Sequence, residues 1–222
     1  MTLVIGAKSV DGIVVATDQL AMRGGEPSYS NKIFEIGRVV FALAGPTGVS
    51  DDFLLLLNDE EKRRKGFSRL YEVKVTVEDI VSELSKRYVE RLGESGGIGA
   101  VMAGLSEITR GEAQIYHILP QGYGEITRDL ICLGSGSPYA TCIVKFLCQT
   151  GLTVEQNAYL AAFVVFWVSE EVSRTVGGTP QVAMMRNEKP EIVYLDQARI
   201  EDARKKVEQA RRNLRKLFGL NK

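Results

Sequence analysis

The chain has 222 residues, of which 45% are apolar and 25% are charged, and this composition excludes a disordered, collagen-like or coiled-coil protein. Its length favours a single domain over residues 1–222. Lysine plus arginine equals aspartate plus glutamate, at 28 each, so no overall charge favours a nucleic-acid partner or an anionic membrane.

The cysteine, histidine and hydropathy patterns bear on location and cofactors. Three cysteines without a CxxC pair indicate neither a disulfide framework nor a zinc ribbon. The single histidine, His117, argues against a Ser-His-Asp triad or a multi-histidine metal site, and we expect it to be structural. No secretory signal opens the sequence, and its longest apolar run, 158–168, is shorter than the roughly 20 residues that span a bilayer. We therefore expect a cytoplasmic protein that needs no metal and no cofactor and does not bind a membrane.

The first part of the chain predicts strands followed by helices. Runs of β-branched and aromatic residues predict strands at 3–5, 12–18, 32–36 and 39–44. A helix carrying Phe53 and Leu57 follows, and a second helix is predicted to begin at Thr76, where residues 76–79 approximate a capping box.

The same order returns in the second part. Strands are predicted at 98–105, 113–119 and 130–133, helices at 137–148 and from Thr153 to about Val172, and short strands at 181–185 and 192–195. A C-terminal amphipathic helix over 198–219 carries one apolar stripe, formed by Ala203, Val207, Ala210, Leu214 and Leu217. Separate blocks of strands and helices, without βαβ alternation, predict a layered α+β fold with antiparallel sheets.

Five short segments of this sequence stand out as motifs: TLVIG (2–6), DGIVVATD (11–18), NKIFEI (31–36), ALAG (42–45) and LGSGSPY (133–139). Together they resemble the proteasome β-subunit and HslV group of N-terminal-nucleophile (Ntn) hydrolases, most closely the archaeal-type β-subunits. The five segments occur in the family's order and cover about residues 2–195, so together they are specific although each is short. The resemblance implies a four-layer αββα sandwich of two antiparallel sheets flanked by helices.

A threonine nucleophile needs a base within hydrogen-bond reach, because an alcohol must lose its proton as it attacks. A terminal threonine can use its own α-amine, which titrates near ~8 and is far closer to working pH than a lysine near ~10.4. Thr2 directly follows Met1, so we expect a methionine aminopeptidase to expose this amine. If Met1 is retained, the amine is an amide and the base is lost.

The resemblance also implies roles for residues around Thr2. Asp18 and Lys32 would form an ion pair, Gly45 would donate its N–H to the oxyanion, and Ser135 would orient the amine. The specificity pocket would be lined by Ala21, Leu43 and Thr47, which gives a mainly apolar pocket without a fixed charge and predicts apolar residues at the cleaved position. Taken by themselves, Asp18 and Lys32 also fit an ordinary pair at strand ends, Gly45 a turn glycine, and Ser135 a helix cap.

The sequence departs from the family in residues 169–178, where an aspartate and a serine usually precede glycine. An ungapped count puts Ser173 and Val176 at those two positions, so both roles would be lost. An insertion would put Glu170 and Ser173 there, and a shift by one residue would offer Thr175. The sequence does not choose among these alternatives, and Ser173 is the candidate we carry forward.

The resulting prediction is a threonine-type peptidase that acts on peptides or unfolded proteins through an acyl-enzyme on Thr2. A non-catalytic ring subunit and an amide-transferring (transpeptidase) relative are the alternatives. The resemblance further implies a ring homo-oligomer, with α-type subunits or an ATP-dependent unfoldase as candidate partners.

Overall fold

The strands form two five-stranded sheets and a separate hairpin in a computed structural model that describes residues 2–23, 26–93, 97–107, 110–147 and 151–219. The first sheet has the order β10 (Leu130–Leu133), β1 (Val4–Lys8), β2 (Gly12–Thr17), β11 (Gln181–Arg186) and β12 (Ile192–Tyr194). The second has the order β5 (Ile33–Ile36), β6 (Val39–Ala44), β7 (Gly99–Glu107), β8 (Arg110–Ile118) and β9 (Gly124–Thr127). All neighbouring strands in both sheets are antiparallel, as predicted.

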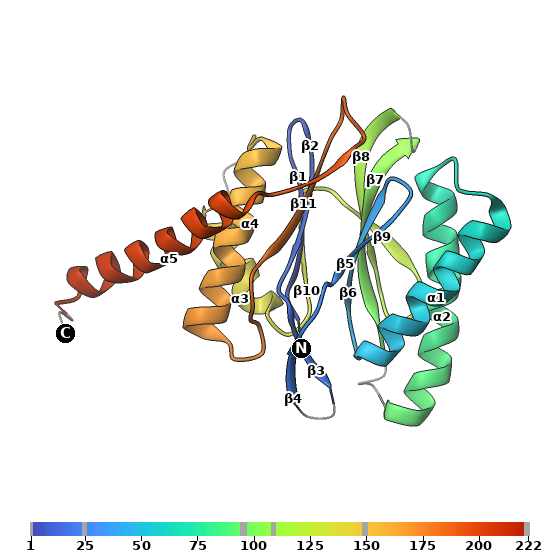
Figure 1. Cartoon of the computed structure of the whole chain (residues 1–222), viewed down its shortest axis with the longest axis horizontal. Coiled ribbons are helices and arrows are strands. Elements are labelled where there is room, and N and C mark those ends of the chain that lie inside the picture. The colour runs from blue at the N-terminus through green and yellow to red at the C-terminus, as the bar shows by residue number, and fades with distance from the viewer. Residues whose placement is uncertain (1, 24–25, 94–96, 108–109, 148–150, 220–222) are drawn as a thin grey trace.

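Helices cover the outer face of each sheet (Figure 1). On the second sheet these are α1 (Thr47–Arg64) and α2 (Leu70–Leu92); on the first they are α3 (Ser137–Leu147) and α4 (Val154–Trp167), and α5 (Gln197–Leu217) packs against α4. The order helices, sheet, sheet, helices confirms the predicted four-layer sandwich. No helix in the described ranges is both long and apolar enough to cross a bilayer.

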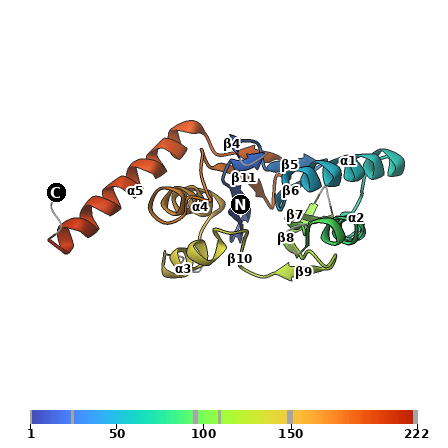
Figure 2. The ribbon, with the colours of Figure 1, turned by 90° about the horizontal axis from the view of Figure 1, so that it is seen from below.

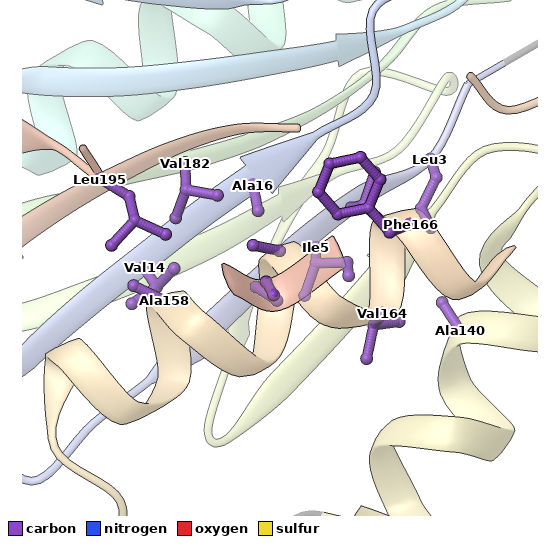
Figure 3. Close-up of a cluster of buried hydrophobic side chains, with 14 of the residues drawn as sticks. Leu3, Ile5, Val14, Ala16, Ala140, Ala158, Val164, Phe166, Val182 and Leu195 are labelled. Atoms are coloured by element: carbon purple, nitrogen blue, oxygen red, sulfur yellow. The ribbon is translucent and has the colours of Figure 1, made fainter. Parts of the chain in front are cut away.

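Strand β2 lies at the centre of the molecule and is buried along its whole length. Its residues alternate between two cores, as the two-residue period of a strand requires. Val14 and Ala16 face α4 together with Ile5 of β1 (Figure 3), whereas Ile13 and Val15 pack between the two sheets. Both faces of the strand are therefore held by apolar packing up to the residue that follows it, Asp18.

Two differences from the predicted elements have local causes. Helix α2 begins at Leu70, not at Thr76, because the Glu72 carboxylate accepts the N–H groups of Ser68 (3.0 Å) and Arg69 (3.3 Å) at the start of the helix. The Thr76 hydroxyl donates to the Glu72 carbonyl inside the helix. The hairpin β3 (Leu20–Arg23) and β4 (Glu26–Tyr29) was not predicted, because its second strand is exposed and contains a proline, which weakens the strand pattern.

Helix α5 is buried along its first half only. Ile200, Ala203 and Val207 pack into the core, whereas Leu214 and Leu217 are 45% and 76% exposed. Figure 2 shows the reason: α5 leaves the body toward its C-terminal end. The predicted apolar stripe is thus only partly buried within this chain.

The single histidine provides a test of the fold. His117 lies on β8 opposite Val101 and Glu125, and within the described residues its Nε2 has no hydrogen-bond partner. Burial lowers its pKa, and the nearby Glu125 carboxylate opposes this effect only in part. Because the unfolded chain takes up the proton near pH ~6.5, below that pH protonation favours the unfolded state.

We therefore expect the free energy of unfolding in urea to fall between pH 7 and pH 5, and to fall less in His117→Gln than in the wild type. The difference between the two proteins isolates the histidine from the other groups that titrate. An equal fall in both would show that His117 is not held in its neutral form.

Candidate active site

The carboxylate of Asp18 is completely buried and accepts four hydrogen bonds. Its Oδ1 accepts from the N–H of Leu3 (2.9 Å) and from Lys32 Nζ (2.7 Å). Its Oδ2 accepts from the N–H groups of Leu20 (3.1 Å) and Gly177 (3.0 Å). These four donors occupy the lone-pair sites of an ionised carboxylate, so Asp18 joins four separate segments at one point.

Lys32 links this carboxylate to Thr2. Its Nζ donates to Asp18 Oδ1, to the Leu20 carbonyl (2.5 Å) and to Thr2 Oγ1 (2.9 Å), which uses all three protons of an ammonium group. Burial lowers the pKa of Lys32, and the charge and hydrogen bond of Asp18 counteract part of that effect. The threonine oxygen therefore accepts a hydrogen bond from a cation, which favours loss of the threonine proton.

Thr2 is 4% exposed, and the turn after β10 holds its backbone. Its carbonyl accepts from the N–H of Gly136 (3.2 Å), and its nitrogen lies 3.3 Å from Ser135 Oγ. Gly134 has a φ of +92°, and a side chain there would collide with the Thr2 carbonyl. Glycine is required at this position for both reasons.

A chain of three hydroxyl groups approaches the Thr2 nitrogen. Ser135 Oγ lies 3.0 Å from Thr175 Oγ1, which in turn lies 2.7 Å from Ser173 Oγ. Of the alternatives that the sequence left open, Ser173 and Thr175 are thus both brought to the site. Glu170 points elsewhere, since its carboxylate pairs with Arg204 on α5 at 2.9 Å.

A cavity of about 370 Å³ opens beside Thr2. The three residues predicted to line a specificity pocket all contribute to its wall, and so does Gly45, which follows β6 and is exposed. These residues are Ala21, Leu43 and Thr47. Lys32 and Asp51 line the same cavity, so the expectation of a pocket without a fixed charge is wrong. The preference for apolar residues at the cleaved position stays a prediction.

Two contributors were missed from the sequence. Asp51 lies one helical turn after Thr47 on α1, and this four-residue spacing could have placed it at the cavity. Gly177 contributes its backbone N–H, which no side-chain pattern reveals. In the described ranges there is no cluster of three or more histidine, cysteine, aspartate or glutamate residues that could hold a metal.

Comparisons with known proteins show the family of the chain. A model of the proteasome subunit family matches residues 2–179. The chain belongs to the proteasome subunit family. No protein among the curated sequences matches it significantly.

Solved structures of Anbu proteins share the fold of this family member. Anbu (ancestral beta-subunit) from Yersinia bercovieri aligns with a TM-score of 0.78 at 16% identity, covering 100% of this chain and 98% of its own. An Anbu (Gly-1) mutant from Hyphomicrobium sp. strain MC1 aligns with the same TM-score at 14% identity, covering 99% and 100%. At these identities the likeness shows the fold alone, a proteasome-like Ntn sandwich.

Because the Asp18–Lys32 pair is buried, we expect Asp18→Asn to lose much of its stability. The substitution leaves the Lys32 ammonium buried without its counter-charge, which costs about 3 kcal/mol in the free energy of unfolding. Guanidinium titration of the purified variant measures this loss.

The matched control is Asp59→Asn, which removes an exposed carboxylate 3.9 Å from Lys62. It should change the free energy of unfolding by less than about 0.5 kcal/mol. Equal effects of the two substitutions would contradict a structural role for the buried pair.

Proposed function

We propose that this proteasome-family chain is a threonine-type peptidase, with Thr2 as the N-terminal nucleophile once Met1 has been removed. The contact between Lys32 Nζ and Thr2 Oγ1 at 2.9 Å carries the proposal. Because the hydroxyl oxygen accepts from this cation, its own proton is left to be donated to a base. The nitrogen of the same residue, held beside Ser135, is that base when it is an amine.

The reaction then proceeds through an ester on Thr2. The amine takes the hydroxyl proton while Oγ1 bonds to the scissile carbonyl carbon, whose oxygen becomes an anion that the N–H of Gly45 stabilises. The C–N bond breaks as the ammonium returns the proton to the leaving amine. A water molecule then gives a proton to the α-amine of Thr2 and bonds to the ester carbon. Oγ1 regains that proton, and the carboxylic acid leaves.

The proposed substrate is a peptide or an unfolded protein. The cavity combines apolar walls from Ala21 and Leu43 with a carboxylate at Asp51, and this favours an apolar residue and disfavours an acidic one at the cleaved position. A chain without defined structure can present an extended segment to a cavity of this size.

Intact mass spectrometry tests the nucleophile. We expect the purified protein to have lost Met1 and to gain one adduct with a peptide epoxyketone, which requires both the hydroxyl and the amine of a terminal threonine. Thr2→Ala should gain no adduct. Thr175→Val, which breaks the hydroxyl chain, should label about tenfold more slowly, since misplacement of a proton-transfer group costs at least that much.

The outcomes separate the alternatives. Retained Met1, or a processed Thr2 that never gains the adduct, would contradict the peptidase proposal and favour a non-catalytic subunit. An adduct together with ligated products, in the presence of an acceptor amine, would favour the transpeptidase. Hydrolysed products alone support the peptidase.

We also propose that the chain assembles with copies of itself, as the family resemblance implies. Large apolar side chains are exposed at the end of α3 and on the outer half of α5, with Phe146 87% and Leu217 76% exposed. Both line one apolar groove together with Phe163 and Trp167 of α4. Burying these side chains against another copy would remove apolar surface from water. Association with α-type subunits or with an ATP-dependent unfoldase stays a prediction.

Light scattering of the purified protein tests the assembly. We expect a mass of several chains for the wild type and a smaller mass for Phe146→Glu. Leu55→Glu, which introduces the same charge at an exposed position of α1, serves as the control and should leave the mass unchanged. A monomeric wild type, or equal effects of both variants, would contradict the proposed groove contact.

A further inference from the structure

The segment that carries Ser173 begins at an unusual turn. Helix α4 continues into a short π-helix, η2 (Val168–Val172), which closes when the N–H of Ser173 donates to the Val168 carbonyl at 2.8 Å. Val168 itself is fully buried in the core beneath α3 and α4. Turns of this type are rare and occur often at functional sites. The position of Ser173 therefore depends on how η2 is held.

Two ion pairs hold η2 against the C-terminal helix. Glu170 pairs with Arg204 at 2.9 Å, and the adjacent Glu171 pairs with Arg211 at 2.9 Å. The two arginines are seven residues apart on α5, which is two helical turns or roughly 10 Å. Adjacent carboxylates that reach two different turns fix the orientation of η2 as well as its position. Arg204 is further placed by the ring of Phe166 on α4, 5.8 Å away.

The other end of the same segment is held at the active site. The N–H of Gly177 donates to Asp18 Oδ2 at 3.0 Å, and the Gly177 carbonyl accepts from the N–H groups of Gln19 and Leu20, at 2.9 Å each. Residues 173–176 thus lie between one anchor at α5 and one at Asp18. The hydroxyls of Ser173 and Thr175, which lead to Ser135, lie between these anchors.

We propose that Arg204 and Arg211 are positioning residues, which set the hydroxyl chain of Ser173, Thr175 and Ser135 against the Thr2 amine by holding η2 on α5. This inference rests on the proposed function, because the chain matters only if the Thr2 amine is the base. It gives α5 a role in the reaction although no residue of α5 lines the cavity beside Thr2 in the described structure.

The alternative is that these are ordinary surface ion pairs. The side chains of Glu170 and Glu171 are 25% and 23% exposed, and those of Arg204 and Arg211 are 51% and 42% exposed. Pairs with this exposure contribute little to stability. Removing them should therefore leave the melting temperature nearly unchanged, and a large effect on the reaction would have to come from geometry.

The test uses the full-length protein and the double variant Arg204→Gln/Arg211→Gln. We expect kcat for peptide cleavage and the rate of epoxyketone labelling to fall about tenfold, with an unchanged KM, because the cavity is intact while the amine is misoriented. Hydrogen exchange of the Ser173 amide should become faster. The conservative variant Arg204→Lys/Arg211→Lys should recover most of the rate.

The matched control is Arg212→Gln/Arg215→Gln, which removes two exposed charges from the same helix. It should keep the wild-type rate and the wild-type exchange at Ser173. The inference would be overturned if Arg204→Gln/Arg211→Gln cleaved peptide as fast as the control. It would also be overturned if the rate fell only in proportion to the melting temperature and the Arg204→Lys/Arg211→Lys variant did not recover it.

The experiment distinguishes this inference from the proposed function. If the processed wild type does not label at all, the proposed function fails. Hydrogen exchange of the Ser173 amide then still shows whether Arg204 and Arg211 hold η2, since this measurement does not require an active enzyme. Wild-type exchange in the double variant would overturn the positioning role in an active or an inactive protein.

Discussion

The buried carboxylate of Asp18 constrains the site more than any other group. A charged carboxylate away from water is stable only when its oxygens are fully hydrogen-bonded. Here the four donors come from Leu3, Leu20, Lys32 and Gly177, which lie in different parts of the sequence. The hydrogen bonds to this one carboxylate therefore bring together four parts of the chain: the start of β1, the start of the hairpin, Lys32 and the end of the 173–177 segment. Thr2 is placed because it directly precedes Leu3.

The sandwich makes this arrangement rigid. Strand β2 delivers Asp18 from the centre of the first sheet, and β6 delivers Gly45 from the second. Because each strand is packed on both faces, the position of its end is fixed. The residues just beyond the end no longer pair with a neighbouring strand, so their backbone groups are available for other contacts. The cavity beside Thr2 lies where these strand ends meet the hairpin and α1.

Residues 169–178, which depart from the family pattern, bring hydroxyl groups toward the Thr2 nitrogen through Ser135. Two hydroxyl side chains, Ser173 and Thr175, connect to Ser135 where an aspartate and a serine are usual in the family. The two glutamates of the segment turn outward to α5. A hydroxyl can both donate and accept a hydrogen bond, so a chain of hydroxyls can satisfy the Thr2 nitrogen as an amine or as an ammonium group without adding a fixed charge.

Local patterns made most of the fold predictable. Strands β6 and β10 and the Thr153 cap of α4 follow from β-branched runs and from a capping box, and these signals act over a few residues. The start of α2 and the β3–β4 hairpin were not predictable in the same way. Their signals are weak: a carboxylate inside the helix caps the start of α2, and the second strand of the hairpin is exposed and contains a proline.

For the site, the sequence by itself determined the residue types and their order along the chain: Thr2, Asp18, Lys32, Gly45 and Ser135. These stand in short motifs, and their roles were predicted from the resemblance of those motifs to the family. Only the tertiary structure showed that Ser173 and Thr175 both approach Ser135 while Glu170 pairs with Arg204, and only it assigned Asp51 to the cavity wall. The physical reason is that a π-turn changes which way successive side chains point, and that a backbone N–H such as that of Gly177 has no signature in the sequence.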